Sequence, residues 1–340
     1  LLALPFFFTS CEKDKIEGPS LNDLYGELTI LESLNIVGDS ADFSNNQSMY
    51  FTASFSKQVD WKIKIEGLNS GSVKIISGKS NTINQSNSTW DGSSTEIPFF
   101  IAEDCDVQLT FEMHDDTTNN QLHIQSPKLY NDENTVLIID FENGFNPNFT
   151  GYFNSGAWGP FIQNNPNPNP LTTGGSGQGT KYLEQHGTVD WDWLIGYVDY
   201  STELWQDVYA NGENLINDPS KVYFNIMIKG DSTISIVTGG PNTLFKLEFH
   251  EDENGDGYYD SNTEDMYSYE FLVDWNGWRM VSICYNDADK LLLATIGGDA
   301  VRNPSKISNV RTLLLANPDS GPAKADLDFL IWSFGSPILN

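Results

Sequence analysis

The chain has 340 residues, more than a typical single domain, and this length predicts two domains. Its 47 Asp and Glu against 18 Lys and Arg give a formal net charge of -29, which argues against nucleic acid as a partner. Aromatic residues make up 13 %, and Asn, Ser, Thr and Gly crowd the regions between apolar runs. This composition favours an extracytoplasmic all-β protein with long polar loops, and its three Cys supply no disulfide framework.

The first twenty residues predict an export signal and a lipid anchor. Residues 1–10 are apolar but too few to span a bilayer of about 30 Å, so we interpret them as the end of a secretory signal peptide. The sequence Phe8-Thr-Ser-Cys11 resembles a bacterial lipobox, and this resemblance implies that Cys11 becomes a lipidated N-terminus. The charged residues 12–17 resemble the signal that sends Bacteroidetes-type lipoproteins to the outside of the outer membrane. A buried N-terminal strand is the alternative for residues 1–10.

Residues 21–130 predict a first domain built from short alternating strands. Apolar side chains recur at every second position in several segments, which is the period of a strand with one buried face. These segments are Phe51/Ala53/Phe55, Trp61/Ile63/Ile65 and Val107/Leu109/Phe111/Met113. A β-sandwich of about a hundred residues follows. Residues 61–71 and 90–92 resemble the immunoglobulin-like spacer domains of bacterial surface proteins, and we interpret Trp61 and Trp90 as packing residues rather than ligand platforms.

A short polar stretch, residues 131–134, predicts the boundary to a second domain over 135–340. So short a connection predicts that the two domains keep a restricted relation. Period-two strands separated by loops rich in Gly, Asn and Asp continue through this domain, and they fit a jelly roll of two packed antiparallel sheets. The clearest are Val222/Phe224/Ile226/Ile228, Phe245/Leu247/Phe249, Tyr267/Tyr269/Phe271/Val273 and Val281/Ile283/Tyr285.

Two acidic strands predict how the second domain closes. Residues 136–144 are an apolar strand that carries Asp140 and Glu142, and residues 326–332 are its counterpart with Asp326 and Asp328. Alternation puts each carboxylate pair on one face, with Ile139 and Phe141, or Leu327, Phe329 and Ile331, on the other. If the first and last strands lie together, Asp140, Glu142 and Asp328 are candidate ligands for calcium. A solvated acidic face is the alternative.

Several Trp residues are candidate platforms for a ligand. Trp158 lies in a Gly/Pro loop, Trp191 and Trp193 share a face if their segment is extended, and Trp205 follows. Asp190 and Asp192 lie opposite this pair. Sugars stack their C–H faces on aromatic rings and offer hydroxyls to acidic and amide side chains, so this combination favours a glycan. Packing of Trp191 and Trp193 in the core is the alternative.

Trp275 is a further candidate from the segment Trp275-Asn-Gly-Trp278. Asn-Gly predicts a two-residue hairpin. We assign Trp278 to the packing of that hairpin and keep Trp275 as a secondary candidate for glycan binding.

Residues 252–260 predict a calcium loop. Oxygen-bearing side chains stand at positions one, three, five and nine, namely Asp252, Asn254, Asp256 and Asp260, with Gly at position six, as in the front half of an EF-hand loop. Position twelve is Thr263 rather than Glu. An acidic hairpin without an ion is the alternative.

Catalysis receives little support from the sequence. The four His show no metal-ligand spacing, and neither a nucleophile elbow nor a nucleotide-binding loop occurs. A jelly-roll glycoside hydrolase or polysaccharide lyase would need a carboxylate pair or a Tyr/His/Arg set in its cleft. A surface adhesin that binds protein is the other alternative.

Taken together, these features resemble the surface glycan-binding lipoproteins of Bacteroidetes polysaccharide-utilisation loci. The resemblance rests on Cys11 with its charged continuation, the immunoglobulin-like spacer, and a last domain that opens with Asp140-Phe-Glu-Asn-Gly144 and closes with Asp326-Leu-Asp-Phe329. It implies an all-β chain in which an immunoglobulin-like β-sandwich precedes a larger jelly-roll carbohydrate-binding module of the galactose-binding type. It also implies a cell-surface lipoprotein of the outer membrane that captures a polysaccharide without cleaving it and hands it to an outer-membrane transporter, often with a structural calcium. The acidic composition favours a neutral β-glucan, xylan or mannan over an anionic polymer.

Overall fold

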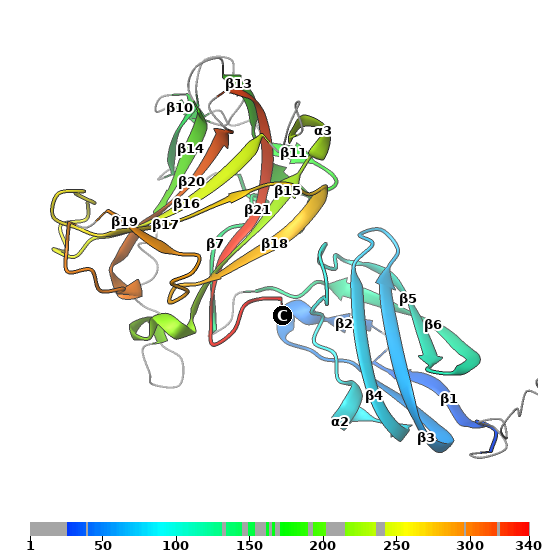
Figure 1. Ribbon diagram of the computed structural model, residues 1–340. Helices are drawn as coiled ribbons and strands as arrows, with labels where there is room; N and C mark the ends of the chain where they lie inside the picture. Colours follow the sequence, from blue (N-terminus) through cyan, green and yellow to red (C-terminus); the bar gives the residue numbers. More distant parts are fainter. Residues whose placement is uncertain are drawn as a thin grey trace, which may run out of the picture.

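The computed structural model describes residues 26–38, 40–130, 134–144, 149–153, 171–189, 193–201, 215–235, 242–295, 297–317 and 320–339, and the backbone alone of 161–162 and 165–166. Nearly every element in these ranges is a strand, and the two α-helices among them have four residues each (Figure 1). These helices are α2 (Gln85–Ser88) and α3 (Ser232–Ser235), beside the 3₁₀ turns η1 (Phe43–Asn45), η3 (Leu215–Asn217), η4 (Pro219–Lys221) and η5 (Pro304–Lys306). The predicted all-β class is confirmed. No helix in these ranges has the length and apolar character needed to cross a membrane.

The first domain is a sandwich built around one long strand. Its strands are β1 (Ile30–Val37), β2 (Ser40–Asp42), β3 (Tyr50–Gly67), β4 (Val73–Ile83), β5 (Glu103–Phe111) and β6 (His114–Ser126). The eighteen residues of β3 pair with β1 over their first part and with β5 over their second, and β4 pairs along the other edge. Alternation along β3 sends its odd-numbered side chains from 51 to 55 and from 59 to 65 into the core.

Both Trp residues assigned to packing in this domain are buried, which confirms that interpretation. Trp90 lies edge-on to Phe43 and Phe100, with ring centroids 4.8 and 5.1 Å apart. Trp61 packs its indole over Gly78 and donates its Nε1 hydrogen to Ser80. Buried aromatic pairs of this kind contribute about 0.5–1.5 kcal/mol beyond their buried area.

The second domain consists of two packed antiparallel sheets, the architecture of a jelly roll. The first sheet holds β7 (Thr135–Ile139), β11 (Leu171–Thr173), β12 (Lys181–Leu183), β13 (His186–Val189), β15 (Val222–Gly230), β18 (Gly277–Cys284) and β21 (Gly321–Phe334). The second sheet runs β19–β17–β16–β20–β14–β8, with β8 (Thr150–Phe153), β14 (Leu194–Ser201), β16 (Thr243–Glu251), β17 (Met266–Leu272), β19 (Leu292–Thr295) and β20 (Ile307–Ala316). A two-stranded ladder of β9 (Phe161–Ile162) and β10 (Asn165–Pro166) lies beside β8 and is hydrogen-bonded to neither sheet.

The two sheets share a core because alternate residues of their strands point toward each other. On β16, Phe245, Leu247 and Phe249 are fully buried, and Phe224 of β15 meets Phe249 at 5.3 Å across the sandwich. Trp332 of β21 lies 4.9 Å from Phe224. Burial of each such side chain contributes about 1.5–3 kcal/mol, so the apolar positions of each strand determine which of its residues face outward.

The first and last strands of this domain lie side by side, as predicted, because β7 pairs with β21. The predicted division of faces on β21 is wrong after Asp328. Phe329 has a φ of 47°, in the left-handed region, and the register shifts there, so Leu327 and Trp332 enter the main core while Phe329 and Ile331 face the other side of the sheet. A bulge adds one residue to the strand and reverses the alternation that follows.

The side chains turned outward by this bulge join the two domains. Phe329 and Ile331 form an apolar cluster with Met227 of β15 and with Phe99 from the first domain. The Phe99 ring lies 4.7 Å from Tyr130 and 5.3 Å from Phe329, and the Phe99 N–H donates to the carbonyl of Gly177. The first domain thus covers part of the outer face of the first sheet, and the C-terminus lies where the domains meet (Figure 1).

We expect Phe99→Asp to separate the domains, because burying an unpaired charge in this cluster costs several kcal/mol. Small-angle scattering should show a radius of gyration that rises by several ångströms. Leu68→Asp is the control, since it adds the same charge at a side chain that is 53 % exposed on the same domain. Equal scattering curves for the two variants would contradict the docking role of Phe99.

Candidate functional site

Most of the predicted glycan-binding residues lie outside the described part of the chain. This applies to Trp158, Asp190, Trp191, Asp192 and Trp205, and also to the predicted lipidation site Cys11. The other two predicted glycan-binding residues, Trp193 and Trp275, are described by the structure.

Trp193 stands directly before β14, and its side chain is 48 % exposed. Its carbonyl accepts a hydrogen bond from the Ala316 N–H at 2.7 Å, which extends the pairing of β14 with β20 by one residue. The backbone of Trp193 is therefore fixed to the second sheet while its indole is open to solvent, as a ligand platform requires.

Trp275 is committed to packing at the edge of the sandwich. Its ring lies nearly parallel to Phe271 at 6.2 Å, the guanidinium of Arg279 sits 4.4 Å from its centroid, and its Nε1 donates to the Ile228 carbonyl. The predicted hairpin is also wrong, because β17 pairs in the second sheet and β18 in the first. The segment 273–276 instead carries the chain from one sheet to the other.

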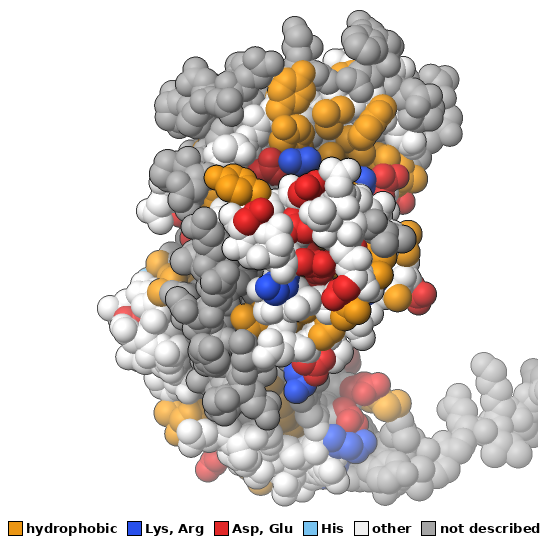
Figure 2. All heavy atoms as spheres, turned by 90° about the vertical axis from the view of Figure 1, so that its left-hand side faces the viewer, with side chains coloured by type: hydrophobic (Ala, Val, Ile, Leu, Met, Phe, Trp, Pro, Cys, Tyr) orange, Lys and Arg blue, Asp and Glu red, His pale blue; other side chains and the backbone are white. Residues whose placement is uncertain are grey.

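A hollow of about 510 Å³ lies on the outer face of the second sheet. Its lining comes from all six strands of this sheet and from the loop between β16 and β17: Thr150, Asp199, Ser201, Glu248, His250, Gly257, Tyr258, Tyr259, Ser261, Met266, Thr295, Ser308, Asn309 and Arg311. Figure 2 shows the side of the molecule that lies to the left in Figure 1, with acidic side chains gathered in its middle below a group of hydrophobic ones. This face is opposite to the one that the first domain covers.

A row of charges crosses the floor of this hollow. Strand register places Arg311 of β20 beside Asp199 of β14 on one side and beside Glu248 of β16 on the other. Arg311 donates two hydrogen bonds to Asp199, from Nε to Oδ1 at 2.7 Å and from Nη2 to Oδ2 at 3.1 Å. The Nη1 atom of Arg311 lies 3.8 Å from the carboxylate of Glu248. Lys246 and His250, the neighbours of Glu248 on the same face of β16, lie 2.8 and 3.5 Å from its carboxylate.

These partners favour the charged forms of Glu248 and Arg311. Burial alone would raise the pKa of Glu248, but hydrogen bonds and charge from His250 and Lys246 bring it down to about 2. Burial also disfavours the Arg311 cation, but the hydrogen bonds and charge of Asp199 raise its pKa. The two carboxylates and the two permanent cations of the row balance, so the floor has many hydrogen-bonding groups and little net charge.

Aromatic rings border the row. Arg311 lies 4.4 Å from the Tyr197 centroid, and Tyr197 faces Tyr152 of the neighbouring strand β8. On the other side, Tyr259 stacks on His250 at 4.4 Å, while Tyr258 is 79 % exposed. Flat apolar faces beside fixed donors and acceptors are the surfaces that bind a sugar ring and its hydroxyls.

Sequence reasoning missed these residues, although part of the signal was present. Tyr197, Asp199 and Ser201 alternate with buried positions of β14, and Lys246, Glu248 and His250 alternate with the Phe and Leu of β16. Alternation alone predicts that they face outward. It does not give the order β16–β20–β14, which brings Glu248, Arg311 and Asp199 together.

Two of the three predicted terminal-strand ligands, Glu142 and Asp328, bind one segment, residues 177–181. Glu142 accepts hydrogen bonds from the backbone N–H groups of Thr180 and Lys181 at 2.7 and 2.6 Å. Asp328 accepts from the N–H groups of Gly177 and Gln178, both at 2.9 Å, and burial raises its pKa well above the usual value. Asp140 accepts from the Glu142 N–H. The carboxylates therefore hold the Gly-rich loop in place, and calcium at this position stays a prediction.

The four residues of the predicted calcium loop are occupied with the backbone of the same loop. Asp252 accepts from the N–H groups of Gly255, Asp256 and Gly257, and Asn254 accepts from Asp256. Asp260 accepts from Asn262. In the described ranges, three acidic side chains offer oxygens within 4.8 Å of one another at Glu251, Glu253 and Asp265, which flank this loop.

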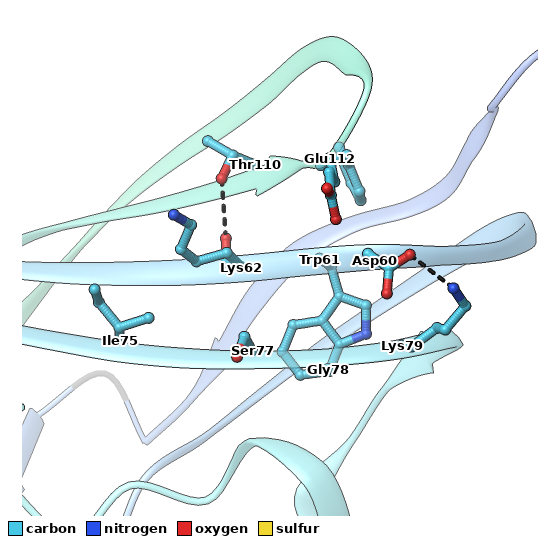
Figure 3. A pocket seen from close by; sticks show the side chains of 10 residues that line it. Asp60, Trp61, Lys62, Ile75, Ser77, Gly78, Lys79, Thr110 and Glu112 are labelled. Atoms are coloured by element: carbon cyan, nitrogen blue, oxygen red, sulfur yellow. Dashed lines mark hydrogen bonds and ion pairs between the residues drawn. The ribbon is translucent and has the colours of Figure 1, made fainter. Parts of the chain in front are cut away.

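A second hollow, of about 860 Å³, lies on the first domain around Trp61 (Figure 3). The indole lies across Gly78, where a Cβ atom would come within 2.5 Å of it, so glycine is required at this close approach. Asp60 and Lys79 on its rim pair with each other at 2.9 Å. Trp61 is buried, which leaves this hollow without an aromatic face open to a ligand.

No protein-family model and no curated protein matches the chain. Among solved structures, it is similar to the Family 11 Carbohydrate-Binding Module from Clostridium thermocellum in complex with a β-1,3-1,4-mixed-linked tetrasaccharide, with 15 % identity and a TM-score of 0.35. That match covers 59 % of this chain and 96 % of the module. The chain is also similar to a xylan-binding module of family 15, with 8 % identity and a TM-score of 0.28, over 59 % of this chain and 97 % of that one.

We expect the charge row to stabilise the second domain above about pH 4.5 and to lose this effect in acid. The folded pKa of Glu248 is about 2 against an ordinary value of 4.5, so the stabilisation is present above the unfolded pKa and disappears as the pH falls through the folded one. The Tm of Glu248→Gln should lie below that of the wild type at pH 6, and the gap should close toward pH 2. A gap that stays constant over this range would contradict the assignment.

Proposed function

We propose that this protein binds a polysaccharide without cleaving it, in the hollow on the outer face of the second sheet. The observation that carries the proposal is the row Asp199–Arg311–Glu248, fixed by its own ion pairs and bordered by Tyr197 and the exposed Tyr258. Rings stack on sugar C–H faces, and charged groups in fixed positions donate to and accept from hydroxyls. A rigid site of this kind binds with little ordering cost.

The glycan we propose is a neutral one of the β-glucan, xylan or mannan class. The ion pairs of the row neutralise each other, so Arg311 and Lys246 are not available to balance the carboxylates of an anionic chain. The net charge of -29 repels polyanions over longer distances. Uncharged hydroxyl-rich chains avoid both penalties.

A jelly-roll lyase or hydrolase is the second candidate, and one observation favours it. Tyr259, His250 and Arg311 line the same hollow, and these are the residue types that such an enzyme uses. Arg311, however, is bound to Asp199 and Glu248, and His250 is stacked under Tyr259 and paired with Glu248. Groups held this way are poorly placed to neutralise a substrate carboxylate or to move a proton, so we favour binding.

The cellular setting is also a proposal. Cys11 with the charged residues 12–17 supports a lipid anchor on the outside of the outer membrane, and delivery of the glycan to an outer-membrane transporter fits that place. The apolar cluster around Phe99 supports a spacer role for the first domain. Through this cluster the first domain covers part of the outer face of the first sheet, and the outer face of the second sheet stays open to a glycan.

We expect Tyr258→Ala and Tyr197→Ala each to weaken glycan binding about tenfold, which corresponds to about 1.4 kcal/mol of lost stacking. The test is retention in affinity gels that contain β-glucan, xylan or mannan, followed by calorimetry with the polymer that retains the protein. Tyr258→Ala should leave the Tm unchanged because its side chain is 79 % exposed.

Met113→Ala is the matched control, since Met113 is an apolar side chain with 78 % exposure on the first domain. Retention that is the same for the wild type, both Tyr variants and this control would contradict the proposed site. New reducing ends or unsaturated products after incubation with a glycan would favour the enzyme instead.

A further inference from the structure

Three carboxylates converge at the base of the acidic loop, on residues that the glycan hollow does not use. Glu251 ends β16, Asp265 stands directly before β17, and Glu253 lies two residues into the loop between them. One carboxylate oxygen from each lies within 4.8 Å of the others, while Glu251 and Asp265 are fully buried. Two oxygens bound to the same calcium ion at 2.3–2.6 Å are at most about 5 Å apart, so this spacing suits one ion.

The negative charge of this cluster has no basic partner in the described part of the chain. Two cations of this region bind backbone carbonyls instead: Arg302, which stacks on the Tyr267 ring at 4.4 Å, donates to the carbonyls of Tyr285 and Leu291, and Lys306 donates to that of Glu253. Repulsion among buried carboxylates that lack a cation is costly.

Three buried polar atoms at the cluster lack a hydrogen-bond partner. Two are carboxylate oxygens of the cluster itself, Oε2 of Glu251 and Oε1 of Glu253. The third is the hydroxyl of Tyr267, whose side chain is 2 % exposed and whose ring lies 5.7 Å from that of Tyr285, the residue that donates its hydroxyl hydrogen to Glu251. Buried oxygens are normally satisfied by a donor or an ion, and these three have neither.

The surrounding backbone holds the carboxylates in place from one side. Asp265 accepts from the N–H groups of Gly298 and Ala300 at 3.0 and 2.6 Å, and Oε1 of Glu251 accepts from the Asn303 N–H and the Tyr285 hydroxyl, both at 2.7 Å. A Cβ atom at Gly298 would come within 2.1 Å of the Glu253 carboxylate. Hydrogen bonds within the protein therefore fix the positions of Glu251 and Asp265, and Gly298 leaves room for the Glu253 carboxylate.

We propose that Glu251, Glu253 and Asp265 bind one calcium ion, which fixes both ends of the loop between β16 and β17. All three ligands are oxygens, whereas zinc prefers nitrogen and sulfur and magnesium keeps most of its waters with one or two carboxylates. This ligand set differs from the one predicted within the loop, Asp252, Asn254, Asp256 and Asp260. It places the ion at the base of the loop instead of inside it.

The ion also bears on the glycan hollow, a consequence that rests on the proposed function. The same loop contributes Gly257, Tyr258, Tyr259 and Ser261 to the lining. A loop fixed at its base presents these side chains in one arrangement and lowers the ordering cost of binding. Calcium should therefore strengthen retention of the glycan without contacting it.

The first test is calcium binding by the chelator-treated protein, measured by calorimetry and thermal unfolding without any glycan. We expect a site with a Kd of about 0.1–1 mM, as in other extracellular modules, and a rise in Tm of roughly 5 °C at about a hundredfold excess over Kd. Glu253→Gln, at a partly exposed position, should weaken this site at least tenfold. Asp256→Asn is the matched control because its amide oxygen still accepts from the Tyr258 N–H, and it should bind like the wild type.

Unchanged calcium affinity in Glu253→Gln would overturn the proposal, and so would loss of the site in Asp256→Asn, which would place the ion inside the loop. Asp265→Asn provides a second check, since it should abolish the calcium-dependent rise in Tm. A separate experiment measures retention in the glycan affinity gels. Removal of calcium with a chelator should weaken retention of the wild-type protein but not that of Glu253→Gln. Calcium binding with no retention on any gel would retire the proposed function and leave the metal site standing.

Discussion

Alternation along the strands of the second sheet is the constraint on which the candidate site depends. On β16, Phe245, Leu247 and Phe249 are driven into the core, and this burial forces Lys246, Glu248 and His250 onto the outer face. Because each such strand contributes several kcal/mol of apolar burial, the outer side chains cannot exchange faces without loss of the fold. The charge row of the hollow is thus positioned by the core behind it.

The outer faces of the two sheets of the second domain differ because of a single irregularity in β21. The left-handed residue Phe329 reverses the alternation of β21, so that Phe329 and Ile331 become an apolar patch on the outside of the first sheet. Exposed apolar patches favour association, and Phe99 and Tyr130 of the first domain cover this one. Among the residues that the structure describes, the centre of the second sheet carries no such patch, and the side chains of Asp199, Arg311 and Glu248 pair with one another there.

The sequence predicts the all-β class and the pairing of β7 with β21, since both follow from local alternation and from matching acidic strand ends. It fails at Phe329, because an aromatic residue gives no signal of a left-handed φ. It also fails for Trp275, where Asn-Gly marks a crossing between sheets instead of a hairpin. Asp199, Glu248 and Arg311 lie more than 45 residues apart, and only the order of the strands, a non-local property, makes them neighbours. The Trp residues at 158, 191 and 205 lie outside the described ranges, and their role stays a prediction.

Two carboxylates three residues apart on β16, Glu248 and Glu251, differ in pKa because they lie on opposite faces of the strand. Glu248 faces outward, where Lys246 and His250 hold its pKa at about 2, and it serves the hollow as a permanent anion. Glu251 faces inward among other carboxylates, and burial with their charges raises its pKa to about 7. In the described ranges Glu251 has no basic partner, whereas Glu248 is paired with Lys246 and His250. Since the loop that follows Glu251 returns to the hollow with Tyr258 and Tyr259, the calcium ion that we propose at the base of this loop would act on a ligand in the hollow without contacting it.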